Sequence, residues 1–256
     1  MPSDYTVAEL VAEFLDKCEV EAAFGIVSVH NIPVLDAVAR SNRMRFVPTR
    51  GEMGATHMAD GYTRAADTLG VIVTSTGPGA ANTVGGLAEA RFALSPLLHI
   101  TGQTPTNLIG RGMGPVHEIP DQLGIMAAAG KAAYRIRAGS EAFAVLKRAV
   151  EDAMTPPCGP VTVEIPIDVQ RTVIERPAGP TSTPCPGPSR SARPQWRSTG
   201  WWRWRSRRGG RCCGSATVPR TPASRRGSCS ISVSARSPAG PGAAWSATAT
   251  RVTSGR

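Results

Sequence analysis

The sequence contains no run of about 18 apolar residues, which excludes a membrane-spanning helix within it. Its six cysteines form no Cys-x-x-Cys pair, so neither a zinc site of the usual spacing nor a disulfide framework is indicated. The first residues carry acids inside an apolar pattern and no basic leader, unlike a secretory signal peptide. These absences predict no membrane partner and a cytoplasmic, reducing location.

A second set of absences divides the chain after Pro177. Residues 178–256 contain fourteen Arg but no Lys, Asp, Glu, His or Leu, so they carry +14 while residues 1–177 carry −4. Leu is normally among the commonest residues, so this composition lies outside ordinary globular usage. We therefore predict a folded domain over 1–177 and a low-complexity tail over 178–256 that is rich in Arg, Pro, Ser, Gly and Trp.

Three interpretations of the tail compete. Its favoured residues are mostly specified by codons rich in G and C, so a GC-rich gene translated in the wrong frame would give this mixture. A natural basic arm that binds nucleic acid is a second interpretation, but such arms usually mix Lys with Arg. A flexible extension is the third. The frameshift is the favoured interpretation, and nucleic-acid binding is a weaker alternative.

Apolar periodicity in residues 1–177 predicts alternating helices and strands. Thr6 and Glu9 form a capping-box pattern before an amphipathic helix. This alternation predicts an α/β fold, with a parallel sheet flanked by helices. The predicted strands are 22–25, 44–47, 70–74, 97–101, 132–136 and 161–165, and further helices are predicted at 32–39, 52–64, about 80–92 and 140–154.

Glycine and polar residues directly follow four of the predicted strands. The carboxyl ends of parallel strands meet at one edge of a sheet, and ligands of open α/β sheets bind there. The sequence therefore predicts a ligand site at this edge. The segments that would form it are 25–31, 51–52, 77–82 and 102–103.

Glu52 and the Gly77-Pro78-Gly79 segment each have two interpretations. Glu52 could simply complement a helix dipole, or it could be a partly buried carboxylate that exchanges a proton with a bound heterocycle. The glycine segment could be a plain turn, or it could let a flat ring or a phosphate approach the backbone. It matches neither phosphate-loop pattern, since no Gly-Lys-Ser/Thr follows and position 82 is Asn.

His117, Glu118 and Asp121 have the residue types of a metal cluster. Three such residues at loop spacing without a partner motif are more often surface residues, so no metal site is predicted. His30 and His57 are interpreted as structural or surface residues.

Taken in order, four segments resemble the N-terminal pyrimidine-binding domain of thiamine diphosphate enzymes. Acetolactate synthase is the nearest likeness, followed by enzymes like benzoylformate decarboxylase. The resemblance covers about residues 5–175, ending with the strand that precedes Asp168. The segments that carry it are Phe24-Gly25, Arg50-Gly-Glu-Met-Gly-Ala55, Thr76-Gly-Pro-Gly-Ala80 with Asn82, and Pro96-Leu-Leu-His-Ile-Thr-Gly-Gln103.

The resemblance implies a role for each matching residue. Glu52 is the catalytic position, which hydrogen-bonds the aminopyrimidine of thiamine diphosphate and exchanges a proton with it. The cofactor then supports decarboxylation of a 2-keto acid, whose product is protonated or joined to a second carbonyl. By the same likeness Gly25, Pro78 and Asn82 border the cofactor, and Gln103 and His117 lie on the substrate side.

The chain departs from the family pattern at three places. Gly51 stands where the family usually has His, and Val27-Ser28-Val29 replaces Pro-Gly-Gly. His117 replaces a Gln of the synthases. A decarboxylase or carboligase that acts on another 2-keto acid therefore stays open beside acetolactate synthase.

The resemblance also implies a site that this chain only half supplies. Family members carry a further domain whose Gly-Asp-Gly…Asn motif holds magnesium and the diphosphate, and the tail contains no Asp. We expect a truncated enzyme that is inactive alone, with magnesium only in a full-length parent and flavin left open. The expected partner is a second copy, in a homodimer, or a chain that bears the diphosphate domain. A non-catalytic binding or complementation module is the alternative.

Overall fold

The capping box predicted at the N-terminus is confirmed in the computed structural model, which describes residues 5–177. The Thr6 hydroxyl accepts a hydrogen bond from the Glu9 backbone N–H at 3.4 Å, and the Glu9 carboxylate accepts one from the Thr6 N–H at 2.9 Å. These bonds satisfy backbone donors that the first helical turn leaves free. Helix α1 (Val7–Lys17) begins there.

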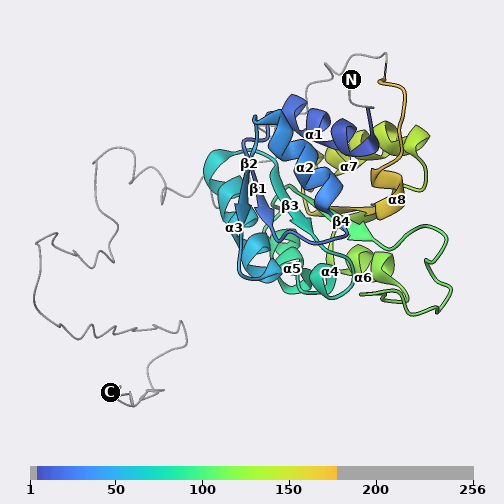
Figure 1. The fold of residues 1–256 in the computed structure, drawn as a ribbon. Helices are drawn as coiled ribbons and strands as arrows, with labels where there is room; N and C mark the ends of the chain where they lie inside the picture. The colour runs from blue at the N-terminus through green and yellow to red at the C-terminus, as the bar shows by residue number, and fades with distance from the viewer. Residues whose placement is uncertain (1–4, 178–256) are drawn as a thin grey trace, which may run out of the picture. The chain divides into compact units, whose positions relative to one another are not determined.

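The predicted parallel sheet is confirmed, and it has six strands in the order β2-β1-β3-β4-β6-β5 (Figure 1). Every pair is parallel. The strands are β1 (Ala22–Gly25), β2 (Arg45–Pro48), β3 (Gly70–Thr74), β4 (Leu97–Gln103), β5 (Ala132–Arg135) and β6 (Val161–Pro166). The further helices are α2 (Ile32–Ser41), α3 (Glu52–Ala66), α4 (Pro78–Ala81), α5 (Val84–Phe92), α6 (Gln122–Ala129), α7 (Ala142–Met154) and α8 (Ile167–Gln170).

The helical segment predicted after the glycine turn is two helices, α4 and α5. Thr83 separates them, because both its hydroxyl (2.7 Å) and its backbone N–H (3.0 Å) bond to the Ala80 carbonyl and tighten the chain locally. The helix predicted from residue 140 begins at Ala142, after a short 3₁₀ turn at Gly139–Glu141. Helices α6 and α8 were not predicted, since neither has a strong apolar period.

Side chains of alternate strand residues pack into two hydrophobic cores, one on each face of the sheet. On β3, Val71 and Val73 join the core under α1, α2 and α7, whereas Ile72 joins the core under α3, α5 and α6. Figure 1 shows these two helical layers on opposite sides of the sheet. Because both faces are covered, every residue of the strands β3, β4 and β6 is buried, as is usual in parallel sheets.

The strand order reverses between β1 and β3. The chain leaves β1 through α2 to one face of the sheet, and it leaves β3 through α4 and α5 to the other. Their carboxyl ends therefore flank the kind of crevice in which α/β proteins bind ligands. The two strands also approach closely here, since a Cβ on Gly25 would lie 1.9 Å from the Val73 carbonyl oxygen.

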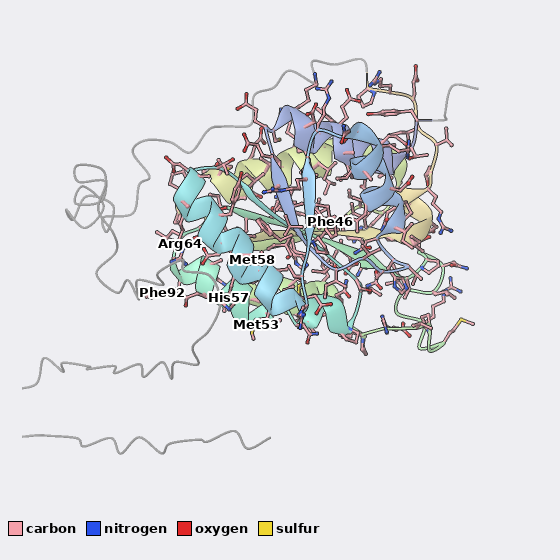
Figure 2. All side chains as sticks on the ribbon, turned by 60° about the vertical axis from the view of Figure 1, so that its left-hand side comes forward. Phe46, Met53, His57, Met58, Arg64 and Phe92 are labelled. Atoms are coloured by element: carbon pink, nitrogen blue, oxygen red, sulfur yellow. The ribbon has the colours of Figure 1, made fainter. Side chains whose placement is uncertain are left out.

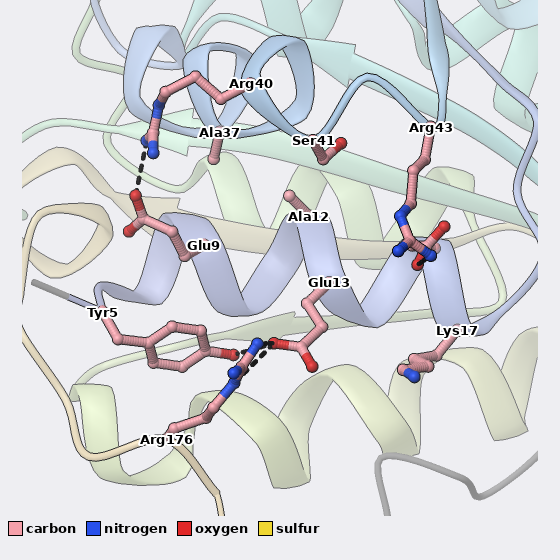
Figure 3. Close-up of a pocket in the computed structure, with 11 residues that line it drawn as sticks. Tyr5, Glu9, Ala12, Glu13, Lys17, Ala37, Arg40, Ser41, Arg43 and Arg176 are labelled. Atoms are coloured by element: carbon pink, nitrogen blue, oxygen red, sulfur yellow. Dashed lines mark hydrogen bonds and ion pairs between the residues drawn. The ribbon is translucent and has the colours of Figure 1, made fainter. Parts of the chain in front are cut away.

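A groove on the outer side of α1 and α2 shares no residue with that crevice (Figure 3). Ion pairs hold its charged groups: Arg40 with Glu9 at 2.6 Å, and Arg176 with Glu13 at 2.8 Å. The Arg176 guanidinium also covers the Tyr5 ring. These charges are used within the domain, so we look for the functional site at the crevice. Within residues 5–177, no helix is both long and apolar enough to cross a membrane.

Candidate functional site

Glu52 lies at the first position of α3, directly after β2 and the short connection that follows it. Gly51, the residue before it, has no side chain to cap the helix, so the Glu52 carboxylate is the acidic group of the first turn. The carboxylate is half-buried and accepts a hydrogen bond of 3.1 Å from the Asn82 amide. Two residues that the sequence predicted for one site are therefore brought together from separate segments.

The glycine turn, Gly77–Gly79, stands between Glu52 and His117. Gly77 has a φ of +60°, and a Cβ there would lie 1.9 Å from the His117 carbonyl oxygen, so both conformation and contact require glycine. At the other end, a Cβ on Gly79 would lie 3.4 Å from Glu52 Oε1. Pro78 occupies the first position of α4 between these two glycines.

Gln103 supports the same turn from below. It is 3% exposed, and its Oε1 accepts hydrogen bonds from the Thr76 hydroxyl (2.9 Å) and the Thr104 N–H (2.7 Å). The structure thus places Gln103 next to the turn, with its carbonyl oxygen already paired. Its predicted substrate-side role stays a prediction.

Gln122, which sequence reasoning missed, joins the glycine turn to the sheet. Its Oε1 accepts a hydrogen bond from the Gly77 N–H (2.5 Å) and lies 2.8 Å from the Thr76 hydroxyl, whose single hydrogen it shares with Gln103 Oε1. Its Nε2 donates to the Gly102 carbonyl (3.2 Å) and to Glu164 Oε2 (2.9 Å). The amide is 1% exposed and fully bonded, so it fixes the turn on the end of β4.

Glu164 and Arg135 complete this buried network. Glu164 is 0% exposed on β6, and its Oε1 pairs with the Arg135 Nε of β5, whose side chain is 22% exposed. The signal that could have identified Glu164 is a single acid inside an otherwise apolar strand, Val161-Thr-Val-Glu-Ile, because buried acids need partners.

The residues considered as a metal cluster have other surroundings. Asp121 caps α6, where its carboxylate accepts a bond of 2.9 Å from the Gly124 N–H. Across residues 5–177, no group of three or more His, Cys, Asp or Glu side chains is placed to hold a metal ion. His57 is exposed on α3, whereas His30 is 8% exposed beside His117.

The arrangement is chemically suited to a planar heterocycle that carries an amino group. Glu52 offers a carboxylate oxygen beside the glycine turn, where the Asn82 amide bonds it and Pro78 is exposed. Two buried hydroxyls of the adjoining segments, Ser75 Oγ and Thr104 Oγ1, have no hydrogen-bond partner. Unpaired buried polar atoms of this kind are costly unless a further group bonds them.

The same part of the chain is similar to known proteins. The family described as "Thiamine pyrophosphate enzyme, N-terminal TPP binding domain" matches residues 5–125. The mitochondrial acetolactate synthase catalytic subunit of Saccharomyces cerevisiae is 33% identical over 181 residues, which are 71% of this chain and 26% of that protein. Acetolactate synthase isozyme 1 large subunit of Escherichia coli is 34% identical over 171 residues, 67% of this chain and 30% of that protein.

A third relative is archaeal. The probable acetolactate synthase large subunit of Methanocaldococcus jannaschii is 37% identical over 163 residues, 64% of this chain and 27% of that protein. The chain thus spans less than a third of the length of each of these relatives. The described α/β unit is therefore an acetolactate synthase-like N-terminal TPP binding domain of the thiamine pyrophosphate enzyme kind.

Proposed function

We propose that this chain supplies the pyrimidine-binding half of a thiamine diphosphate site that acts on a 2-keto acid. The observation that carries the proposal is the Glu52–Asn82 pair at the end of the glycine turn, at a sheet edge of the kind that binds ligands. Thiamine diphosphate, when bound, supplies the electron sink for breaking the bond next to the keto group. The reaction is decarboxylation, with or without ligation to a second carbonyl as in acetolactate synthesis.

The residues of this chain have separate tasks in the proposed site. Glu52 holds and exchanges a proton at its carboxylate, which Asn82 orients through its amide. Gly25 and Pro78 shape the backbone against which the pyrimidine lies. Gln103 and Gln122 keep the turn in place from beneath.

We further propose that the chain needs a partner to complete the site and gives no turnover alone. The matched relatives are more than three times longer than the part that aligns with this chain, which supports a division of the site between polypeptides or domains. Magnesium and diphosphate would then be held by the partner's domain. A complementation module without its own catalysis is the alternative.

The partner surface that we propose is the outer ridge of α3 and α5. Phe92 is 86% exposed, and Met53 and Met58 are 55% and 45% exposed (Figure 2). Large apolar side chains that gather on one face commonly mark an interaction site. A second copy of the chain, or a chain bearing the diphosphate domain, would cover this ridge.

Nucleic-acid binding through the tail, and the frameshift interpretation itself, concern residues 178–256, which lie outside the described residues. The cytoplasmic location likewise stays a prediction.

The proposed cofactor role is tested by Glu52→Gln in the full 256-residue chain. Loss of a hydrogen bond to a charged group costs about 1.5–3 kcal/mol, so we expect thiamine diphosphate to bind about 10- to 100-fold more weakly in isothermal calorimetry. Glu151→Gln, an exposed position on α7, is the matched control and should leave affinity unchanged. Equal affinity of wild type and Glu52→Gln would show that the carboxylate does not hold the cofactor.

The proposed partner surface is tested by Phe92→Asp. If a second copy covers the ridge, a charge at its most exposed aromatic side chain should weaken self-association about tenfold or more in sedimentation equilibrium. Ala144→Asp, exposed on α7 at the other face of the sheet, should leave it unchanged. A wild-type chain that sediments as a monomer at all concentrations would reject the homodimer and leave the diphosphate-domain chain as the proposed partner.

A further inference from the structure

Two histidines from different loops meet at the candidate site. His30 follows β1, and His117 lies in the connection from β4 to α6. Their ring centroids are 5.9 Å apart and their planes are tilted by 42°. The sequence contains only four histidines, and the other two lie elsewhere: His57 is exposed on α3 and His99 is buried within β4.

The backbones of both residues are held firmly from behind. The His30 carbonyl accepts a hydrogen bond of 2.8 Å from Gln170 Nε2, and a Cβ on Gly102 would lie 2.3 Å from that carbonyl oxygen. The His117 carbonyl packs equally closely on Gly77. His117 has a φ of +66°, which is uncommon for a residue with a side chain. The backbones from which the two rings project are therefore held in place.

The His30 ring has hydrogen-bonding capacity that the domain does not use. Its Nδ1 is buried and has no partner, although the residue is only 8% exposed. A buried polar atom left unpaired is destabilising, and a bound ligand that pairs with it removes that cost. Burial, and then the nearby His117, lower the pKa of His30, so its ring is neutral at pH 7 and offers one N–H donor.

His117 and Glu52 lie against different ends of the glycine turn. Glu52 lies against Gly79, whereas His117 lies against Gly77. An anionic ligand group is repelled by Glu52 but can accept a hydrogen bond from each imidazole, one for each oxygen of a carboxylate. The pair therefore suits the anionic end of a substrate better than the cofactor ring.

We propose that His30 and His117 together bind the carboxylate of a 2-keto acid, on the side of the glycine turn opposite Glu52. The choice of a 2-keto acid rests on the proposed function, while the pairing of the two rings as an anion-binding element does not. His30 thereby changes from a structural residue to a substrate-binding residue.

The test uses the ring proton–carbon resonances of the four histidines in the full chain, assigned by single His→Gln variants. Pyruvate is titrated at pH 7 against sodium chloride of matched ionic strength. We expect saturable shifts at His30 and His117 with pyruvate only, and none at His57 or His99. His30→Phe and His117→Asn should each weaken the remaining ring's response about tenfold or more, whereas His57→Gln should preserve it.

A parallel titration with thiamine diphosphate separates the two proposals. If the cofactor binds in a Glu52-dependent way but pyruvate leaves His30 and His117 unmoved, the substrate-binding pair is wrong and the proposed function stands. If pyruvate moves the pair and the cofactor does not bind, the proposed function fails and the carboxylate site stands. Equal chemical-shift changes at all four histidines, or the same changes with sodium chloride, would also overturn the proposal that His30 and His117 bind the carboxylate. The wild-type spectra decide the matter even if a variant fails to fold.

Discussion

Replacing Glu164 by leucine is expected to lower the free energy of unfolding by about 3–5 kcal/mol, because it leaves a mostly buried guanidinium without its partner. Glu164 is 0% exposed and pairs with Arg135, whose side chain is only 22% exposed. The variant also removes one of the two acceptors of Gln122 Nε2. Urea unfolding at pH 7.5, followed by far-ultraviolet circular dichroism, measures the change.

A matched substitution on the surface controls for the loss of an acid. Glu151 pairs with Lys147 at 3.7 Å, with both side chains nearly half exposed, and Glu151→Leu should change stability by less than about 0.5 kcal/mol. Combining Glu164→Leu with Arg135→Met should recover part of the loss, since a buried pair can often be replaced by apolar residues at little cost. If Glu164→Leu alone costs less than about 1 kcal/mol, the pair does not hold the network together.

The same network connects the core to the candidate site. Gln122 bonds Glu164 on one side and both Thr76 and the Gly77 N–H on the other. Freeing one end of this amide would loosen the turn that carries Pro78. The network thus explains how residues of the sheet, distant from Glu52 in the sequence, contribute to the position of the turn beside it.

Most of the fold could be predicted because its signals are local. The capping box at Thr6, the apolar runs of the strands and the glycines after them each depend on neighbouring residues, and all appear in the structure. Strand order could not be predicted, since it depends on which edges pair across long loops. Helix α6 could not be predicted either. Its alanine-rich sequence has no polar side to contrast with an apolar one, and only its packing on β5 determines which side is buried.

The residues of the candidate site likewise divide into those that the sequence could predict and those that it could not. Glu52, Pro78 and Asn82 follow strands directly, so parallel strands alone predict that they share an edge. Gln122 and Glu164 could not be assigned to the site, because their role lies in hydrogen bonds between segments 42 residues apart. The meeting of His30 and His117 depends equally on how the short β1–α2 loop and the long β4–α6 loop fold at the sheet edge.

His99 predicts the pH dependence of stability. It is fully buried in the central strand β4, between the hydroxyls of Thr74 (2.8 Å from Nε2) and Thr162 (3.1 Å from Nδ1). Burial lowers its pKa from 6.5 to about 3, so the folded protein keeps this ring neutral where the unfolded chain protonates it. Its contribution to stability is therefore complete above pH 6.5 and is lost progressively as the pH falls towards 3.

Each proton bound only by the unfolded state lowers the free energy of unfolding by about 1.4 kcal/mol per pH unit. Between pH 6.5 and 5, where the unfolded ring goes from half to almost fully protonated, His99 alone should therefore account for a loss of about 1.6 kcal/mol, measured by urea unfolding at half-unit steps. Burial also lowers the pKa of His30, which adds a loss of the same sign.

His99→Gln isolates the share of His99, because the amide can still bond both threonine hydroxyls but does not titrate in this range. In this variant the free energy of unfolding should depend less steeply on pH than in wild type, by about the slope that one proton contributes. His57→Gln, at an exposed position, should keep the wild-type slope. An unchanged slope in His99→Gln would mean that the folded protein protonates this ring as readily as the unfolded chain. Because His99 bonds β3 through Thr74 and β6 through Thr162, this slope reports on the centre of the sheet, where β3 leads into the glycine turn.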